Sequence, residues 1–169
     1  GVRLVGSEMC IRDSVALISA LGTRTRFESV PLGDTLGQDN GETFAEYVER
    51  ADRSLAEAPD DEPVFALVTF AADASAEEAS AVLEPVGRVN AVIPPNAPLT
   101  PVGEPKEGRD RTEIFRIATD GELAGAVVRD TGDVLRDIAD DGKIVAVEAL
   151  PSDAVWGAFG VRSVNIQAR

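Results

Sequence analysis

The sequence repeats one order of patterns twice, in residues 64–93 and 123–150. Each repeat begins with an apolar run of strand length, Val64–Phe70 in the first and Leu123–Val128 in the second. A polar segment with apolar residues at helical spacing follows, and a second apolar run closes the repeat. Short continuous apolar runs are typical of strands covered on both faces, and spacings of about three and four residues are typical of an amphipathic helix. The sequence therefore predicts two strand–helix–strand units.

Local signals mark the helix of each unit. Ser75 and Glu78 have the spacing of a capping box, in which each side chain accepts a hydrogen bond from the other residue's backbone N–H. Thr131 can cap the helix of the second unit, and Gly142 suits the C′ position after that helix. The strands that close the two units are predicted at Val89–Ile93 and Ile144–Leu150.

Two such units side by side form an antiparallel sheet with both helices on one face. We therefore predict an α+β fold for residues 63–169, a ferredoxin-like two-layer sandwich. A Pro-rich segment, residues 94–111, separates the two units and is long enough to be a mobile or functional loop. After it, Ile114–Ala118 fits either a strand or one turn of helix.

Residues 27–62 combine a Gly-rich linker with an extra helix that precedes the sandwich. Asn40 is a suitable N-cap for this helix, and Pro59 closes it. The apolar side chains that share one face of the predicted helix are Phe44, Tyr47, Val48, Ala51 and Leu55.

The first fourteen residues are interpreted as non-native. The run Leu4–Ser14 resembles one translated reading frame of a transposase adapter used to prepare sequencing libraries. The resemblance implies that residues 1–14 are a fusion scar and that the native start of the chain is missing. It also removes Met9 and Cys10, the only methionine and cysteine, from the native inventory.

A short apolar run, Val15–Gly22, stands at the start of residues 15–26 and is followed by Arg24 and Arg26. A bilayer-spanning helix needs about 20 apolar residues, so this run is too short to be one. It fits the remnant of a membrane anchor or signal segment, or else a short buried strand or helix end. The first reading places the domain on the extracytoplasmic face of the cell membrane, and the second leaves it in the cytoplasm.

The composition restricts the chemistry of the chain. It has 30 acidic and 16 basic residues, no histidine and a net charge of −14. Mechanisms that require an imidazole base or a cysteine–histidine pair are excluded, and zinc lacks its usual ligands. An excess of negative charge repels the phosphates of nucleic acid. We therefore predict a non-catalytic domain without cofactor or metal and without a nucleic-acid partner.

Two short acidic motifs are candidate sites. Asp130-Thr131-Gly132 has the letters of an aspartic-protease loop, but it occurs once, and Thr131 is better explained as a helix cap. Asp130 is nevertheless the best candidate if the chain uses carboxylates for acid–base catalysis. The run Asp137–Gly142 is similar to a calcium loop, but Ala139 replaces the middle acidic ligand. A solvated helix end explains this run better.

The C-terminal tail holds the candidate interaction residues, which are Trp156, Phe159 and Val161. Bulky apolar side chains at a chain end either close a core or form a docking patch, and we favour closure of the core.

Residues Val64–Pro151 resemble the propeptides of subtilisin-like proteases. The resemblance rests on Glu122–Val127, on Val134-Leu135 and on Val145–Glu148. It implies a ferredoxin-like inhibitor and intramolecular chaperone, which lays its C-terminal segment into a protease cleft. The Pro-rich insertion departs from that pattern.

The chain also resembles membrane-anchored envelope proteins of GC-rich bacteria. We predict an extracytoplasmic domain that acts by binding or structure, attached to the membrane only through a lost N-terminal anchor. Its partner would be another envelope protein or a protease. The alternative is an inhibitor or chaperone module of the propeptide type.

Overall fold

The computed structural model describes residues 16–17, 35–105 and 108–164. The chain divides into two compact units, of which the smaller comprises residues 1–47 and 153–169 and the larger residues 48–152. Among the described residues there are helices and mainly antiparallel strands, which confirms the predicted α+β class. The predicted adapter run and most of the predicted anchor segment lie outside the described residues.

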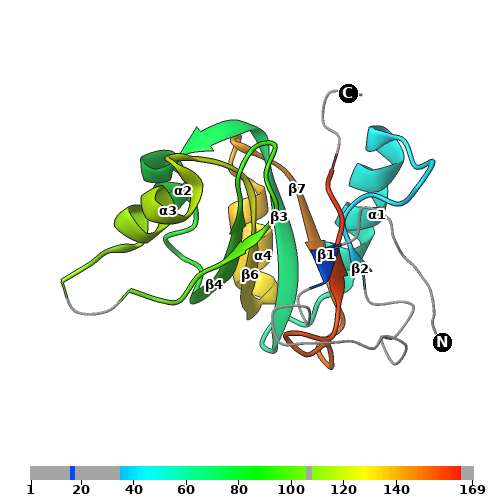
Figure 1. The fold of residues 1–169 in the computed structure, drawn as a ribbon. Coiled ribbons are helices and arrows are strands. Elements are labelled where there is room, and N and C mark those ends of the chain that lie inside the picture. Colours follow the sequence, from blue (N-terminus) through cyan, green and yellow to red (C-terminus); the bar gives the residue numbers. More distant parts are fainter. Residues whose placement is uncertain (1–15, 18–34, 106–107, 165–169) are drawn as a thin grey trace. The chain divides into compact units, whose positions relative to one another are not determined.

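A five-stranded antiparallel sheet forms the centre of the larger unit (Figure 1). Its strand order is β5-β4-β6-β3-β7. Each predicted strand of the two units is present, and a short strand from the Pro-rich segment adds to one edge. The strands are β3 (Pro63–Ser75), β4 (Arg88–Ile93), β5 (Thr100–Pro101), β6 (Glu122–Thr131) and β7 (Ile144–Ala149).

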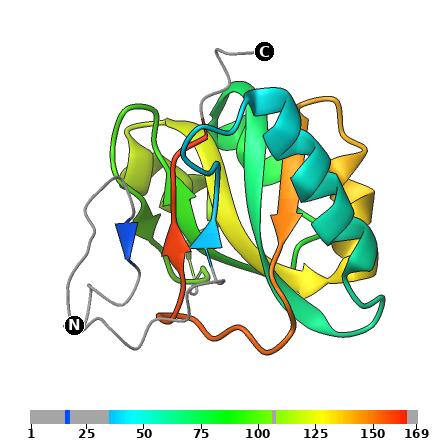
Figure 2. The same ribbon diagram turned by 90° about the vertical axis from the view of Figure 1, so that its right-hand side faces the viewer.

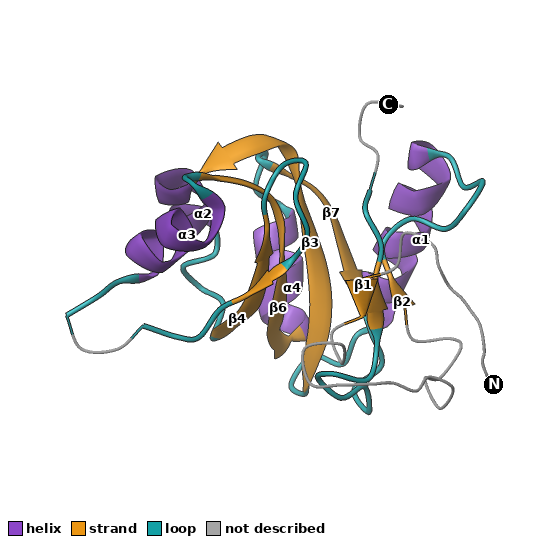
Figure 3. Cartoon of the chain, in the orientation of Figure 1, coloured by secondary structure: helices purple, strands orange, loops and turns teal. Residues whose placement is uncertain are grey.

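The helices are α1 (Phe44–Glu57), α2 (Ala76–Val82), α3 (Arg111–Thr119) and α4 (Gly132–Ala139). Figure 3 shows α2 and α3 in purple, side by side on one face of the sheet. Buried side chains of α2, α3 and α4 belong to one apolar core with alternate residues of β3, so all three helices pack on the same face. The core residues that β3 supplies are Val64, Ala66, Val68 and Phe70.

Strand β3 is buried on both faces, as its continuous apolar run predicts. Phe65, Leu67 and Thr69 alternate with the residues of the helix-side core and are also buried. Glu148 of β7 is buried with them, and Arg50 of α1 forms an ion pair with it at 2.8 Å.

Helix α1 begins later than predicted. Thr43, not Asn40, is its cap: the Thr43 hydroxyl accepts from the Glu46 N–H, and the Glu46 carboxylate accepts from the Thr43 N–H. Four of the five predicted face residues are buried, and Val48 is half-buried. The prediction of the helix was therefore right, and that of its N-cap was wrong.

The second half of α1 lies along β7, the edge strand, as Figure 2 shows in cyan and orange. The Ser54 hydroxyl accepts a hydrogen bond of 2.9 Å from the backbone N–H of Ala149. Ala149 belongs to the edge strand, so one side of its backbone has no neighbouring strand. The Ser54 side chain of α1 accepts the hydrogen bond of the N–H on that side instead.

The end of α1 also contacts the start of α4. The backbone N–H of Gly132 donates to the carbonyl of Pro59 at 2.8 Å. The Arg136 guanidinium donates to the carbonyls of Leu55 and Ala58. Thr131 occupies the N-cap position of α4 as predicted, but its side chain makes no capping bond. The backbone of residues 59–60 satisfies the exposed N–H groups of this helix instead.

The Pro-rich segment is tied to the sheet. Val102 N–H donates to the carbonyl of Asn90, and the Glu104 carboxylate accepts from the backbone N–H of Val89 at 2.7 Å. Arg111 pairs with Glu104 at 3.1 Å and donates to the carbonyls of Leu83, the C-cap of α2, and of Val86 in the following turn. Ile114–Ala118 lies inside α3, so its helical interpretation was the right one.

In the smaller unit, β1 (Ala16–Leu17), β8 (Gly160–Val161) and β2 (Thr35–Leu36) form a sheet in that order. Strand β8 is antiparallel to β1 and parallel to β2. Gly37 has a φ of +104°, and a Cβ there would lie 2.1 Å from the carbonyl oxygen of Arg162. Glycine therefore permits this close approach of the two segments.

Candidate functional site

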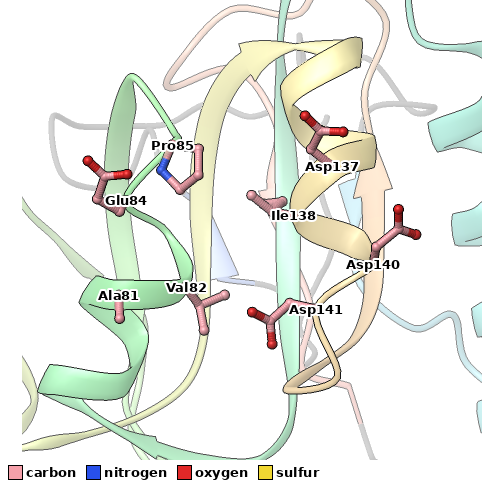
Figure 4. Close-up of a pocket in the computed structure, with 8 residues that line it drawn as sticks. All are labelled: Ala81, Val82, Glu84, Pro85, Asp137, Ile138, Asp140 and Asp141. Carbon is pink, nitrogen blue, oxygen red and sulfur yellow. The ribbon is translucent and has the colours of Figure 1, made fainter.

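An open groove lies between the end of α2 and the end of α4 in the larger unit. Its volume is about 380 Å³, and Figure 4 draws the residues that line it. The motif Asp137–Gly142, similar in sequence to a calcium loop, supplies one wall, and the turn after α2 supplies the other. The lining residues are Ala81, Val82, Glu84, Pro85, Asp137, Ile138, Asp140 and Asp141.

The floor of the groove is apolar. Val82 and Ile138 are buried and belong to the helix-side core. Figure 4 shows their side chains turned toward each other across the groove, with the ring of Pro85 above them. Ala81, on the exposed side of α2, adds a small apolar side chain. The floor can therefore receive an aliphatic group without loss of a hydrogen bond.

The rim of the groove is acidic. Glu84, Asp137, Asp140 and Asp141 are all exposed. Asp141 accepts a hydrogen bond from the backbone N–H of Lys143. In the described part of the chain, the other three carboxylates have neither an ion pair nor a side-chain hydrogen bond. In Figure 4, Asp141 turns toward the groove, whereas Glu84 and Asp140 point outward from it.

These carboxylates oppose the dipoles of both helices. A helix carries partial negative charge at its C-terminus, where basic side chains stabilise it and acidic side chains destabilise it. Helix α2 has no basic residue in its own last turn and Glu84 follows it, although Arg111 of α3 donates to the carbonyl of its C-cap, Leu83. In α4 the last turn contains Asp137, and Asp140 is the C-cap. An arrangement that opposes local stability at one place is typical of a functional site.

Several described cations of the larger unit form contacts away from the rim carboxylates. Arg136 stands in the last turn of α4, but its guanidinium contacts the end of α1. Five basic side chains of this unit pair with carboxylates outside the groove. These pairs are Arg50–Glu148, Arg111–Glu104, Arg116–Glu77, Lys143–Glu78, and Arg136 with Asp60 and Asp133. Arg111 also donates to the carbonyls of Leu83 and Val86, on either side of Glu84 and Pro85, so a positive charge already stands at the α2 wall of the groove. None of these ion pairs includes a carboxylate of the rim.

Metal binding has no support at these acids. Residues 16–17, 35–105 and 108–164 contain no group of three or more His, Cys, Asp or Glu side chains that could hold a metal ion. Ala139 stands where the calcium-like motif would need an acidic ligand.

Asp130, the carboxylate proposed for acid–base chemistry, accepts hydrogen bonds from two backbone N–H groups. Its Oδ2 atom accepts from the N–H of Gly87 at 2.6 Å, and its Oδ1 atom accepts from the N–H of Thr131 at 2.7 Å. Asp130 therefore fastens the end of β6 to the turn before β4.

The predicted interaction residues of the tail lie in the smaller unit. Phe159 and Val161 are buried, and Val161 belongs to β8. Trp156 is half-buried and meets the Phe159 ring edge-on at a centroid distance of 5.9 Å. Val155 next to it is 63% exposed. The structure therefore brings Trp156 and Phe159 together, with only part of the cluster at the surface.

The groove was not predicted as a site from the sequence. Its acids were visible in the run Asp137–Gly142, but Glu84 and Pro85 are distant from them in sequence. The signal that could have found it is the presence of acidic side chains at two helix C-termini, against the usual preference.

Comparisons of the chain with protein-family models, curated proteins and solved structures gave no match. No helix within the described ranges has the length and apolar character needed to cross a membrane.

Proposed function

We propose that the chain is a non-catalytic binding domain that contacts its partner through the groove between α2 and α4. The observation that carries the proposal is the combination of an apolar floor with an acidic rim. Binding sites typically combine a concave apolar surface with a few polar groups that fix the orientation of the ligand. Val82 and Ile138 supply the apolar surface, and the rim carboxylates supply the polar groups.

The compartment is part of the same proposal. The apolar run in residues 15–26 supports a domain held at the extracytoplasmic face of a bacterial membrane, as an envelope protein. Of this segment only Ala16–Leu17, which form β1, are among the described residues.

A selection from a random peptide library tests the groove as the binding site. The expected result is that selected peptides bind the wild-type chain and lose affinity for Ala81→Arg, which places a long side chain in the groove. Ala56→Arg is the matched control, because Ala56 is an exposed alanine of α1 outside the groove. Peptides that bind all three proteins equally, or a selection that yields none, would contradict the proposal.

A second candidate function is a protease inhibitor of the propeptide type, and the strand order favours it. Without β5, the strand order is β4-β6-β3-β7. The first strand of each strand–helix–strand unit, β3 or β6, is therefore at the centre, and the second strand of each unit is at an edge. We propose that this is the ferredoxin-like arrangement, which the resemblance to subtilisin propeptides also implies. In that function the segment after β7, from Leu150 onward, would enter the protease cleft.

An inhibition assay separates the second candidate from the first. The full chain at micromolar concentration should slow the cleavage of a chromogenic peptide by a subtilisin-like protease. Replacement of the exposed Pro151 and Ser152 by aspartate should weaken this effect, whereas Ala81→Arg should leave it unchanged. Unaltered protease activity would exclude the inhibitor function.

A further inference from the structure

We propose that the partner presents a basic peptide segment to the groove, with the aliphatic part of a lysine or arginine side chain on the apolar floor and its charge at the acidic rim. This inference rests on the proposed function and specifies the chemistry of the partner. The evidence for it is the shape of the groove and the charge of its lining residues, all of which belong to the larger unit.

The floor fits the stem of such a side chain. Lysine and arginine bury their methylene groups against apolar surface while the charged end stays in water. Val82 and Ile138 face each other across the groove, and the ring of Pro85 closes one side (Figure 4). The open shape suits a side chain that enters from solvent with its backbone outside.

The rim fits the charge. Asp137 and Asp141 line the groove on the α4 side, and Asp141 turns toward it, whereas Glu84 on the α2 side points outward (Figure 4). The C-terminal end of α4 adds partial negative charge on the same side as Asp137 and Asp141, which favours a cation there. The end of α2 is different, because Arg111 donates to its C-cap carbonyl. The ion pairs among the described residues of the larger unit do not include the rim carboxylates, which leaves these carboxylates open to a positive charge from a partner.

A peptide is a better occupant than a metal ion or a nucleic acid. A hard cation needs several oxygen ligands at once, and no suitable group of three acids exists among the described residues. The acidic rim repels phosphate groups. A basic, partly apolar segment satisfies both the floor and the rim.

Fluorescence anisotropy with defined probes tests the inference. The probe is a labelled peptide of repeated Gly-Arg-Leu, and the two control peptides are repeated Gly-Gln-Leu, without charge, and repeated Gly-Arg-Gly, without apolar side chains. We expect the probe to bind at least about tenfold more tightly than either control, with an affinity that falls as salt is raised.

Two double variants separate the rim from the general charge of the chain. Asp137→Asn/Asp141→Asn should weaken binding of the probe by about tenfold. Glu49→Gln/Asp52→Asn removes the same charge from the exposed side of α1 and should leave the affinity within about twofold. Circular dichroism melting of each variant verifies that it remains folded. Ala81→Arg provides a third variant, which should also abolish binding of the probe.

The outcomes distinguish this inference from the proposed function. Equal losses in the two double variants would show a long-range effect of charge and overturn the inference. Equal binding of the probe and the uncharged peptide would also overturn it, while leaving the groove as a binding site. If the library yields groove-binding peptides that lack basic residues, the inference fails and the proposed function stands.

Discussion

Arg136 Nη1 lies 2.9 Å from the carbonyl oxygen of Leu55, 81 residues earlier in the chain. The same atom is 3.0 Å from the carbonyl oxygen of Ala58, and the other end of the guanidinium contacts Asp60. One side chain of α4 therefore donates to two carbonyl groups at the C-terminal end of α1, of which that of Leu55 also accepts from the backbone N–H of Ala58. This contact fixes the extra helix to the sandwich.

Loss of the Arg136 guanidinium should destabilise the larger unit. We expect Arg136→Ala to lower the free energy of unfolding by about 2 kcal/mol, because the carbonyls of Leu55 and Ala58 lose a charged donor. Urea unfolding followed by circular dichroism measures the change. Arg53→Ala, at an exposed position of α1, should change stability by less than about 0.5 kcal/mol. Equal effects would contradict the clamping role.

A methyl group at Gly132 should disturb the same junction. Its Cβ would lie 2.4 Å from the carbonyl oxygen of Pro59 and 2.8 Å from that of Ala58, so backbone would have to move. We expect Gly132→Ala to destabilise by about 2 kcal/mol, a typical effect of overpacking. Gly142→Ala is the control, because no atom lies within 4 Å of a Cβ there. The midpoints of thermal unfolding would reveal the difference, and an unchanged midpoint in Gly132→Ala would refute it.

Removal of one partner of the Arg50–Glu148 pair should be more harmful than removal of both. The Glu148 side chain is 5% exposed, so Arg50→Met leaves a carboxylate in a buried environment. Loss of one partner of a buried pair typically destabilises by about 3–5 kcal/mol, whereas an apolar replacement of both is often nearly neutral. Chemical unfolding of Arg50→Met, Glu148→Leu and the double variant forms a cycle that measures the coupling. Additive effects would mean that the two charges do not interact.

The ion pair between Glu77 of α2 and Arg116 of α3 should make the stability of the fold depend on pH. The backbone N–H of Glu77 at the start of α2 lowers the pKa of its carboxyl from the usual 4.5, and the Arg116 guanidinium lowers the pKa further. Because the pKa is lower in the folded state, the stabilisation is complete above the unfolded value and is lost as pH falls through the folded value. NMR titration of Glu77 should show its pKa rise in Arg116→Ala and stay unchanged in Arg88→Ala.

Some local signals were sufficient and others were not. The prediction of Gly142 at the C′ position of α4 was wrong, because Asp140 is the C-cap and Gly142 has no positive φ. The capping box of Ser75 and Glu78 forms as predicted, because both residues belong to one helical turn. The predicted N-cap at Asn40 was wrong, although Thr43 and Glu46 have the spacing of a capping box and form its two hydrogen bonds. For Ile114–Ala118, the signal in favour of a helix is Asp110, a favourable N-cap residue whose side chain caps α3.

Features that depend on tertiary packing could not be predicted from local sequence patterns. The N–H groups at the start of α4 bond to the backbone of residues 59–60, which no side-chain pattern near Thr131 indicates. The groove likewise requires the ends of α2 and α4 to meet above Val82 and Ile138. Sequence spacing predicts each helix, whereas their approach depends on how the sheet orders its strands.

The bonds along the sheet margins bear on how the protein behaves when it is concentrated. Unsatisfied backbone groups at a sheet margin recruit strands from neighbouring molecules. Here Glu104 and Val102 occupy backbone groups of β4, and Ser54 occupies the N–H of Ala149 at the opposite margin. A strand from a neighbouring molecule would have to break these bonds before it could pair at these positions, which disfavours fibrillar self-association.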